Sequence, residues 1–370
     1  MQTTQNVPGI AKIEESELMT RAFSILAVVL SISGLLSGLG TISSNLLNLI
    51  QATAVFLVYL YVCYFKNLDL VDLAFILLSF LIAALNRAPY MVSVSMMLMI
   101  MAMAYKNDGL DYRKILSVYV KSCILVFSVI VCAYYVFNFN NHDVTMWRID
   151  KLIYRKSIGF DHPNVAMMEF LGIIYGFLGL LKTKKRKRHL LLLILLSYLI
   201  YTQTVSRTST ILILAALVFI FLLGRKVDQP MPVWLSKAIS LAPLGLMVIS
   251  LYVLFHSYSD QLNTLLSGRL ALYQQYYQEY GIHFLKTPEL ENAMFDSGYL
   301  QSLLSKGGLF SLQLMLVLTY MGWHAKKMTW KAGILLLSFF VLGFTETALQ
   351  HFELFFPIVL ILADNDVKRR

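Results

Sequence analysis

The sequence predicts an all-α, polytopic integral membrane protein, and three observations lead to this class. Of the 370 residues, 58% are hydrophobic and only 14% are charged, whereas soluble domains carry roughly 25% charged residues. A chain this apolar cannot cover its surface with polar groups. Apolar runs of nearly bilayer length also recur along the chain, and in lipid such runs form helices because the backbone must satisfy its own hydrogen bonds.

About twelve such runs follow one another in a single polytopic domain, residues 1–370. The third and fourth runs, and the eleventh and twelfth, can each also be interpreted as one kinked element. The predicted spans, in chain order, are 22–40, 45–64, 70–86, 90–105, 115–137, 163–181, 189–204, 209–224, 234–256, 297–321, 332–345 and 354–364.

The distribution of Lys and Arg predicts the orientation of these spans. The basic run KTKKRKRH, 182–189, is the strongest signal for a cytoplasmic loop. Alternating outward from it places the other basic loops and both termini in the cytoplasm. The net charge of +10 therefore belongs to cytoplasmic loops and does not predict binding to nucleic acid. Two long extracytoplasmic loops are expected, at about 138–162 and 257–296, and the three cysteines show no disulfide or metal-ligand spacing.

Basic residues on the extracytoplasmic side are exceptions to this bias, and they suggest an anionic partner there. Even-numbered helices begin on that side, so their free N–H groups and positive dipole ends form ready anion sites. Three of these helix starts carry polar signatures, namely DHPN (161–164), SRTST (206–210) and DSGYL (296–300). The outer basic residues are Arg87, Arg148, Lys151, Arg155, Lys156, Arg207, Arg269, Lys286 and Lys306.

Each of these polar residues also has a structural interpretation. His162 and Asp296 are natural helix caps. Arg207 suits an interfacial position from which its guanidinium reaches water. Arg269 lies in a segment, SGRLALYQQYYQEY (267–280), whose apolar residues have the spacing of an amphipathic helix lying on the membrane surface.

Four ordered motifs over about 155–353 resemble the bacterial O-antigen ligase and Wzy-type polysaccharide polymerase superfamily. They are GFDHPN (159–164), SRTS (206–209), SGR (267–269) and DSGYLQSLLSKGGLFSL (296–312). A late glutamate in TETALQHFE (345–353) is similar to the polymerases. Ligases usually have His where this chain has Asp296, so the resemblance is greater to capsule or exopolysaccharide polymerases. Ser297 replaces the usual Asn, which leaves a role for that amide unassigned.

The resemblance implies a glycosyltransferase of the GT-C type in the bacterial plasma membrane, with its active site on the extracytoplasmic face. Donor and acceptor would be undecaprenyl-diphosphate-linked oligosaccharides, and the growing chain would pass to the non-reducing end of a new unit. A flippase and a chain-length regulator would be partners beside membrane lipids. No cofactor and no metal is expected, because protein groups neutralise the diphosphate leaving group.

The motifs contain residues that could carry out each step of this reaction. Charge develops on the departing phosphate, and arginine side chains can stabilise it. We therefore expect Arg207 and Arg269 to bind the diphosphate, with Arg155 or Lys156 as a third contact. An attacking sugar hydroxyl needs a base, for which Asp296 is the first candidate and His162 the second. The candidate sugar-binding residues are Tyr273, Tyr277, Glu346 and His351, although the aromatic belts of membrane proteins favour the lipid headgroup layer for the tyrosines.

Two other functions remain open from the sequence. A ligase would share the donor site but transfer finished glycan to a surface acceptor. A lipid-linked oligosaccharide flippase would also need many helices, but it should show repeat symmetry and a site at the membrane midplane, and no repeat is evident in the sequence.

Overall fold

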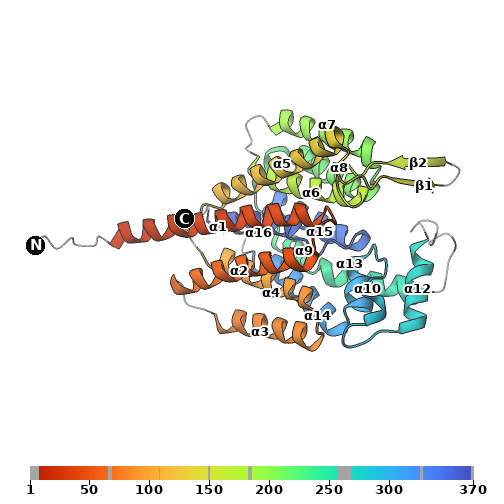
Figure 1. The fold of residues 1–370 in the computed structure, drawn as a ribbon. Helices are drawn as coiled ribbons and strands as arrows, with labels where there is room; N and C mark the ends of the chain where they lie inside the picture. The colour runs from red at the N-terminus through yellow and green to blue at the C-terminus, as the bar shows by residue number, and fades with distance from the viewer. Residues whose placement is uncertain are drawn as a thin grey trace, which may run out of the picture.

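The computed structural model is a bundle of helices with one β-hairpin at its end (Figure 1). The structure describes residues 8–65, 69–107, 109–148, 151–181, 186–256, 260, 263, 268–325 and 328–367. The α-helices are α1 (Pro8–Ser37), α2 (Ser44–Phe65), α3 (Leu70–Leu85), α4 (Ser93–Lys106), α5 (Tyr112–Phe137), α6 (Pro163–Leu180), α7 (Arg186–Thr204), α8 (Arg207–Leu223), α9 (Val233–Ser240), α10 (Ala242–Phe255), α12 (Arg269–Tyr280), α13 (Gly298–Leu300), α14 (Gly308–Trp323), α15 (Trp330–Thr345) and α16 (Phe352–Val367).

Six helical segments of the described chain are long and apolar enough to cross a membrane. A seventh arises if α9 and α10, which meet at an angle of 46°, form one span. Helices α3, α14 and α15 are apolar but shorter. Every apolar run expected from the sequence thus contains helix, while length and composition alone identify six or seven spans. The six are Glu15–Ser37, Ser44–Phe65, Pro89–Lys106, Tyr112–Phe137, Pro163–Leu180 and Arg207–Asp228.

The core of the bundle forms around α16, which packs against α1, α4, α5, α6 and α15. Every residue of α16 from Phe352 to Ala363 is buried, and all of them except Glu353 are apolar. A helix that is apolar almost all round belongs in an interior. By contrast, α2, α3, α5, α7 and α8 expose large apolar side chains on their outer surfaces, among them Leu57, Leu77, Leu125, Leu199 and Phe219. This apolar outer surface indicates a membrane-embedded, all-α protein.

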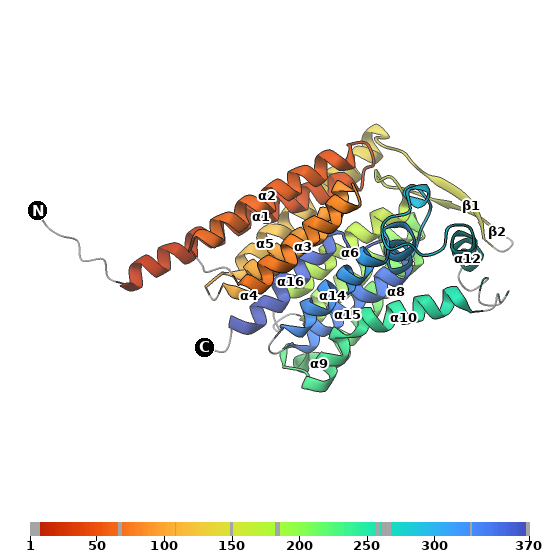
Figure 2. The ribbon, with the colours of Figure 1, turned by 90° about the horizontal axis from the view of Figure 1, so that it is seen from below.

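The first of the two long expected loops contains a two-stranded antiparallel hairpin, β1 (Val144–Arg148) and β2 (Lys151–Arg155). Asp143 anchors its base, because its carboxylate accepts hydrogen bonds from the Tyr134 hydroxyl (2.8 Å), the Ser157 N–H (2.8 Å) and the Tyr154 hydroxyl. We call the end of the bundle from which the hairpin projects the hairpin end. The first and last described residues lie toward the opposite end (Figures 1 and 2).

The second expected outer loop contains α12, which lies across the hairpin end beside α10 (Figure 2). A small apolar core joins α12 to α10 and α13, with the rings of Tyr273 and Phe295 stacked at 5.9 Å. The expected amphipathic helix after residue 268 is therefore present, and its apolar face packs on the protein. The members of this small core are Leu254, Tyr273, Leu290, Phe295, Leu300 and Leu304.

The tenth expected helix, 297–321, is broken in the structure. The short α13 runs into a π-helical turn, Gln301–Ser305, and α14 begins only at Gly308. Gly307 allows the break because its φ is +91°, and a Cβ there would lie 2.4 Å from the backbone carbon of Leu285. Residue 307 must therefore be glycine. The peptide of residues 283–285 lies against this break and accepts a hydrogen bond from the Gly308 N–H (2.8 Å).

Candidate functional site

Polar and charged side chains from four separate segments meet at the hairpin end. They come from the hairpin and the start of α6, from the start of α12, from the residues before α13, and from the turn between α15 and α16. The residues that interact there are Arg155, His162, Asn164, Arg269, Asp296, Glu346 and His351.

Arg155 connects the ends of two helices at this site, although only 3% of its surface is exposed. Its Nε donates to the carbonyl oxygen of Thr204 at the end of α7 (2.8 Å), and its Nη2 donates to Oδ1 of Asn164 at the start of α6 (2.5 Å). A guanidinium stays charged even when buried, so it requires such acceptors. Nδ2 of Asn164 in turn donates to Oε1 of Glu346 after α15 (3.4 Å).

Glu346 is the carboxyl group whose proton affinity suits acid–base chemistry. It follows the last residue of α15, and its backbone carbonyl accepts from the Gly298 N–H at the start of α13 (3.2 Å). Burial, and then the nearby Asp296 carboxylate, raise its pKa to about 7, although the charges of Arg269, Arg155 and His351 oppose the rise. A carboxyl group with this pKa exchanges protons readily near neutral pH.

Asp296 and Arg269 form an ion pair, with Nε and Oδ2 separated by 2.6 Å. The helix cap of α13 is Ser297, whose Oγ accepts from the Leu300 N–H (3.4 Å), so Asp296 is not the cap. The backbone N–H of Asp296 donates to the Tyr273 hydroxyl (3.0 Å). Tyr273 is buried and stacked on a neighbouring ring, so it supports Asp296 and offers no open face to a sugar.

His162 caps α6 in the structure. Its Nδ1 accepts a hydrogen bond from the Asn164 N–H (3.1 Å), so in the neutral ring the proton is on Nε2. Burial and the positive charge of Arg155 lower the pKa of His162. A neutral imidazole whose unprotonated nitrogen already accepts a hydrogen bond is poorly placed to take a proton from a substrate. The geometry therefore favours capping over the second expected role, that of a base.

Lys156 and Arg207 face other parts of the hairpin end. The Lys156 ammonium lies over the ring of Tyr135, 5.4 Å from its centroid, and the backbone N–H of Lys156 donates to the backbone carbonyl of Gln203 (2.8 Å). Arg207 is exposed at the first position of α8 and lines an apolar groove of about 660 Å³ between α7 and α8. The four basic residues expected at one diphosphate therefore do not lie together. Arg155 and Arg269 lie near the carboxyl groups of Asp296 and Glu346, whereas Lys156 and Arg207 lie beside apolar grooves.

The remaining sequence-derived residues have clear positions. Tyr277 is partly buried and packs edge-on against Phe255 (5.1 Å). His351 lies in the turn before α16 and contacts Oε1 of Glu353 through Nδ1 (2.5 Å). A small cavity of about 40 Å³ borders the Arg269–Asp296 pair, and this is room for little more than one water molecule. A sugar would therefore require that pair to separate.

Two features were missed in the sequence. Asn164 lies in the HPN motif and connects Arg155 to Glu346, yet its amide carries no role in the sequence-based assignment. Glu169 in α6 and Glu353 in α16 are buried, and ligand atoms of Glu169, His351 and Glu353 lie within 4.8 Å of one another, a geometry that could hold a metal ion. An ionisable residue inside an apolar helix is the signal that could have identified both glutamates.

Comparisons of the chain with protein-family models, with curated proteins and with solved structures found no match.

Proposed function

We propose that the protein is a polysaccharide polymerase, a glycosyltransferase that joins polyprenyl-diphosphate-linked oligosaccharides at the outer leaflet of a bacterial plasma membrane. The observation that carries the proposal is the Arg269–Asp296 ion pair (2.6 Å) beside Glu346 and the buried Arg155. Such a cluster can both bind a leaving anion and accept a proton. The topology we propose has about twelve spans, both termini in the cytoplasm and the hairpin end outside.

In the reaction, a hydroxyl of the acceptor sugar attacks the anomeric carbon of the donor. The new C–O bond forms as the bond to the lipid diphosphate breaks, and the diphosphate departs with the bonding electrons. Its negative charge requires preorganised positive groups. Arg269 suits this role because its fork can bind two phosphate oxygens, and Arg207 suits it because it lies at the edge of an apolar groove.

The diphosphate also frees the base. A dianionic diphosphate competes with Asp296 for Arg269, since both are oxygen anions and the diphosphate carries more charge. Once released, the Asp296 carboxylate accepts the proton of the attacking hydroxyl. Glu346, with a pKa of about 7, suits a hydrogen bond to the acceptor sugar, and Arg155 and Asn164 position it.

The experiment that tests this function uses the purified protein in lipid nanodiscs and a lipid-linked oligosaccharide as both donor and acceptor. We expect Arg269→Ala to lower polymer formation by about 10²–10³-fold, the usual effect of removing one preorganised charge-stabilising group. Asp296→Asn should lower it by about 10²–10⁴-fold, as for a lost base. Lys286→Ala is the matched control, because Lys286 forms another ion pair at the hairpin end, with Glu291 (3.3 Å). If Arg269→Ala and Asp296→Asn form as much polymer as the Lys286→Ala control, the assignment of these two residues is wrong.

The products in a strain that lacks the protein separate this function from a ligase. Single lipid-linked repeat units should accumulate if the protein is a polymerase, whereas unattached polymer should accumulate if it is a ligase. A flippase and a chain-length regulator are the partners we expect beside the lipid-linked substrates, and neither a metal nor another cofactor enters the proposed chemistry.

One observation favours transport as a second candidate. Glu169 and Glu353 lie buried beside His351 between α6 and α16, and ionisable groups inside apolar helices often mark ion or proton pathways. A proton-coupled flippase would lose translocation of the lipid-linked oligosaccharide on Glu169→Gln. A polymerase supplied with substrate already in the outer leaflet would keep polymerising.

A further inference from the structure

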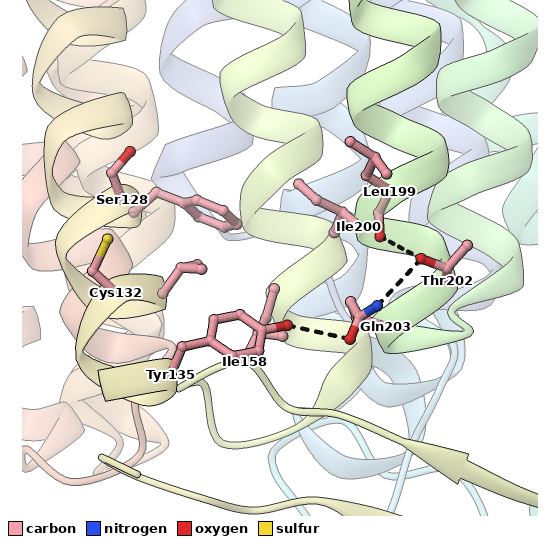
Figure 3. A pocket seen from close by; sticks show the side chains of 10 residues that line it. Ser128, Cys132, Tyr135, Ile158, Leu199, Ile200, Thr202 and Gln203 are labelled. Carbon is pink, nitrogen blue, oxygen red and sulfur yellow. Dashed lines mark hydrogen bonds between the residues drawn. The ribbon is translucent and has the colours of Figure 1, made fainter. Parts of the chain in front are cut away.

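A groove between α5 and α7 opens on the apolar outer surface of the bundle (Figure 3). Both helices pack on α6, which lies behind them. The groove has a volume of about 590 Å³. At about 30 Å³ for each water-sized group, this is room for roughly twenty such groups, or a few isoprene units. The lining residues are Phe127, Ser128, Val131, Cys132, Tyr135, Ile158, Leu199, Ile200, Thr202 and Gln203.

Three of the polar side chains that line this groove, those of Tyr135, Thr202 and Gln203, gather at its hairpin end, whereas Ser128 lies farther along α5. The Tyr135 hydroxyl donates to Oε1 of Gln203 (3.2 Å), and Nε2 of Gln203 donates to Oγ1 of Thr202 (3.4 Å), as Figure 3 shows. The Lys156 ammonium lies over the Tyr135 ring at 5.4 Å, and the backbone N–H of Lys156 donates a hydrogen bond to the backbone carbonyl of Gln203 (2.8 Å). The groove is therefore an apolar slot with one cationic, hydrogen-bonding end. This is complementary to a hydrocarbon chain with an anionic headgroup.

We propose that this groove holds the polyprenyl chain of the acceptor, the lipid-linked oligosaccharide that receives the growing glycan, with its diphosphate at Lys156. The inference rests on the proposed function and deepens it, because it assigns the two lipid substrates to different sides of α7. The donor chain would occupy the groove between α7 and α8, whose edge carries Arg207.

The position of the reacting atom in each substrate decides between donor and acceptor. The donor reacts at the carbon that bears its diphosphate, so that diphosphate must lie beside Asp296 and Arg269. The acceptor reacts at its non-reducing end, which is one repeat unit away from its own diphosphate. The Lys156 ammonium lies over the Tyr135 ring, whereas the neighbouring Arg155 guanidinium is the one that reaches Thr204 and Asn164. An anion held at Lys156 therefore suits the substrate whose diphosphate takes no part in the reaction.

The basic residues at the two grooves support the same assignment of donor and acceptor, because the groove between α7 and α8 has an arginine and the groove between α5 and α7 has a lysine. A leaving diphosphate gains charge in the transition state and requires strong, directional donors, which an arginine supplies. The acceptor diphosphate keeps its charge throughout and only has to be anchored. One lysine with the neutral groups of Tyr135, Gln203 and Thr202 is sufficient for that task.

Photo-crosslinking tests the groove without depending on catalysis. The probe is undecaprenyl diphosphate that carries a diazirine on its isoprenoid chain, bound to the full-length protein in phosphatidylcholine nanodiscs. We expect adducts on Ser128, Cys132 and Ile200, which unlabelled undecaprenyl diphosphate displaces and phosphatidylglycerol does not. Adducts confined to the groove between α7 and α8, or equal displacement by phosphatidylglycerol, would overturn the proposal.

Kinetics of two neighbouring variants distinguish acceptor from donor. Ser128→Trp fills the groove, whereas Val129→Trp adds the same ring at an exposed position of α5 outside the groove lining. We expect Ser128→Trp to remove the crosslinks and to raise the KM for the acceptor about tenfold or more, as hydrophobic pockets discriminate by about 10–200-fold per methylene-sized change. The KM for the donor and both constants of Val129→Trp should stay unchanged. A rise in the donor KM instead would overturn the acceptor assignment.

These outcomes remain separable from the proposed function. Loss of polymerisation in Arg269→Ala with no crosslinks between α5 and α7 would refute the groove and keep the enzyme. Crosslinks in the groove with no polymerisation by any form of the protein would refute the enzyme, and with it the role of the groove as an acceptor site.

Discussion

Replacing Glu346 with glutamine should stabilise the protein at pH 8 and leave its stability nearly unchanged at pH 4. Burial and the Asp296 carboxylate raise the pKa of Glu346 from 4.5 to about 7, so the folded protein binds this proton more tightly than the unfolded chain does. The contribution of this group to stability is therefore complete below pH 4.5 and is lost as the pH rises through about 7. Glutamine is neutral throughout and avoids that loss.

The magnitude follows from the pKa. Each tenfold difference in proton affinity corresponds to about 1.4 kcal/mol, so the change from 4.5 to about 7 sets an upper limit of about 3.5 kcal/mol. Water reaches part of the Glu346 side chain and screens its charge, so we expect about 1–2 kcal/mol. The bond from the Asn164 amide to Oε1 (3.4 Å) can persist, because glutamine retains that oxygen. The Tm at pH 8 should rise by several degrees, at about 2–4 °C per kcal/mol.

Thermal unfolding in detergent from pH 4 to pH 8 measures this effect, with the difference between variant and parent taken at each pH. Glu291→Gln is the matched control, because that carboxylate lies at the same end of the bundle in an exposed ion pair with Lys286 and should change Tm little at any pH. If Glu346→Gln does not raise Tm at pH 8, or raises it equally at pH 4, the argument from burial and like charge is wrong.

Three further predictions concern the structure around the site. Gly307→Ala should destabilise the protein by more than about 1 kcal/mol, because φ is +91° and the new Cβ meets Leu285. The matched Gly245→Ala, in open space on α10, should be neutral or slightly stabilising, and thermal unfolding compares the two. Tyr273→Phe should cost about 1 kcal/mol by removing the acceptor for the Asp296 N–H, and it should lower polymer formation more than stability alone explains. His162→Asn should retain polymer formation, since asparagine also caps helices. Loss of activity in that variant with unchanged Tm would instead make the imidazole a base.

The helices could be predicted from the sequence because lipid leaves the backbone few alternatives. The apolar run 163–181 became α6, and His162 and Pro163 mark its start as cap and first-turn residue. The break in the tenth helix was less predictable. It depends on Gly307 and on a loop peptide, residues 283–285, that packs into the gap. No local periodicity shows where a distant loop will pack.

The site could be predicted as a set of residues but not as a geometry. Arg155 and Lys156 are adjacent in sequence, yet the first is buried among α6 and α7 and the second lies over Tyr135 beside a groove. Alternation at the end of a strand separates neighbours in this way. The cap of α13 is Ser297 where the sequence suggested Asp296, because both residue types cap helices and only the backbone decides between them.

The ion pair between Arg269 and Asp296 would keep the proposed enzyme inactive until its donor binds. With the ion pair closed, the adjoining cavity of about 40 Å³ holds no sugar, and the Asp296 carboxylate is bound to a cation at 2.6 Å. A carboxylate oxygen that is bound to a guanidinium is not free to accept a proton from a hydroxyl. A diphosphate that takes over Arg269 frees the Asp296 carboxylate and makes room for the acceptor hydroxyl in a single exchange of partners.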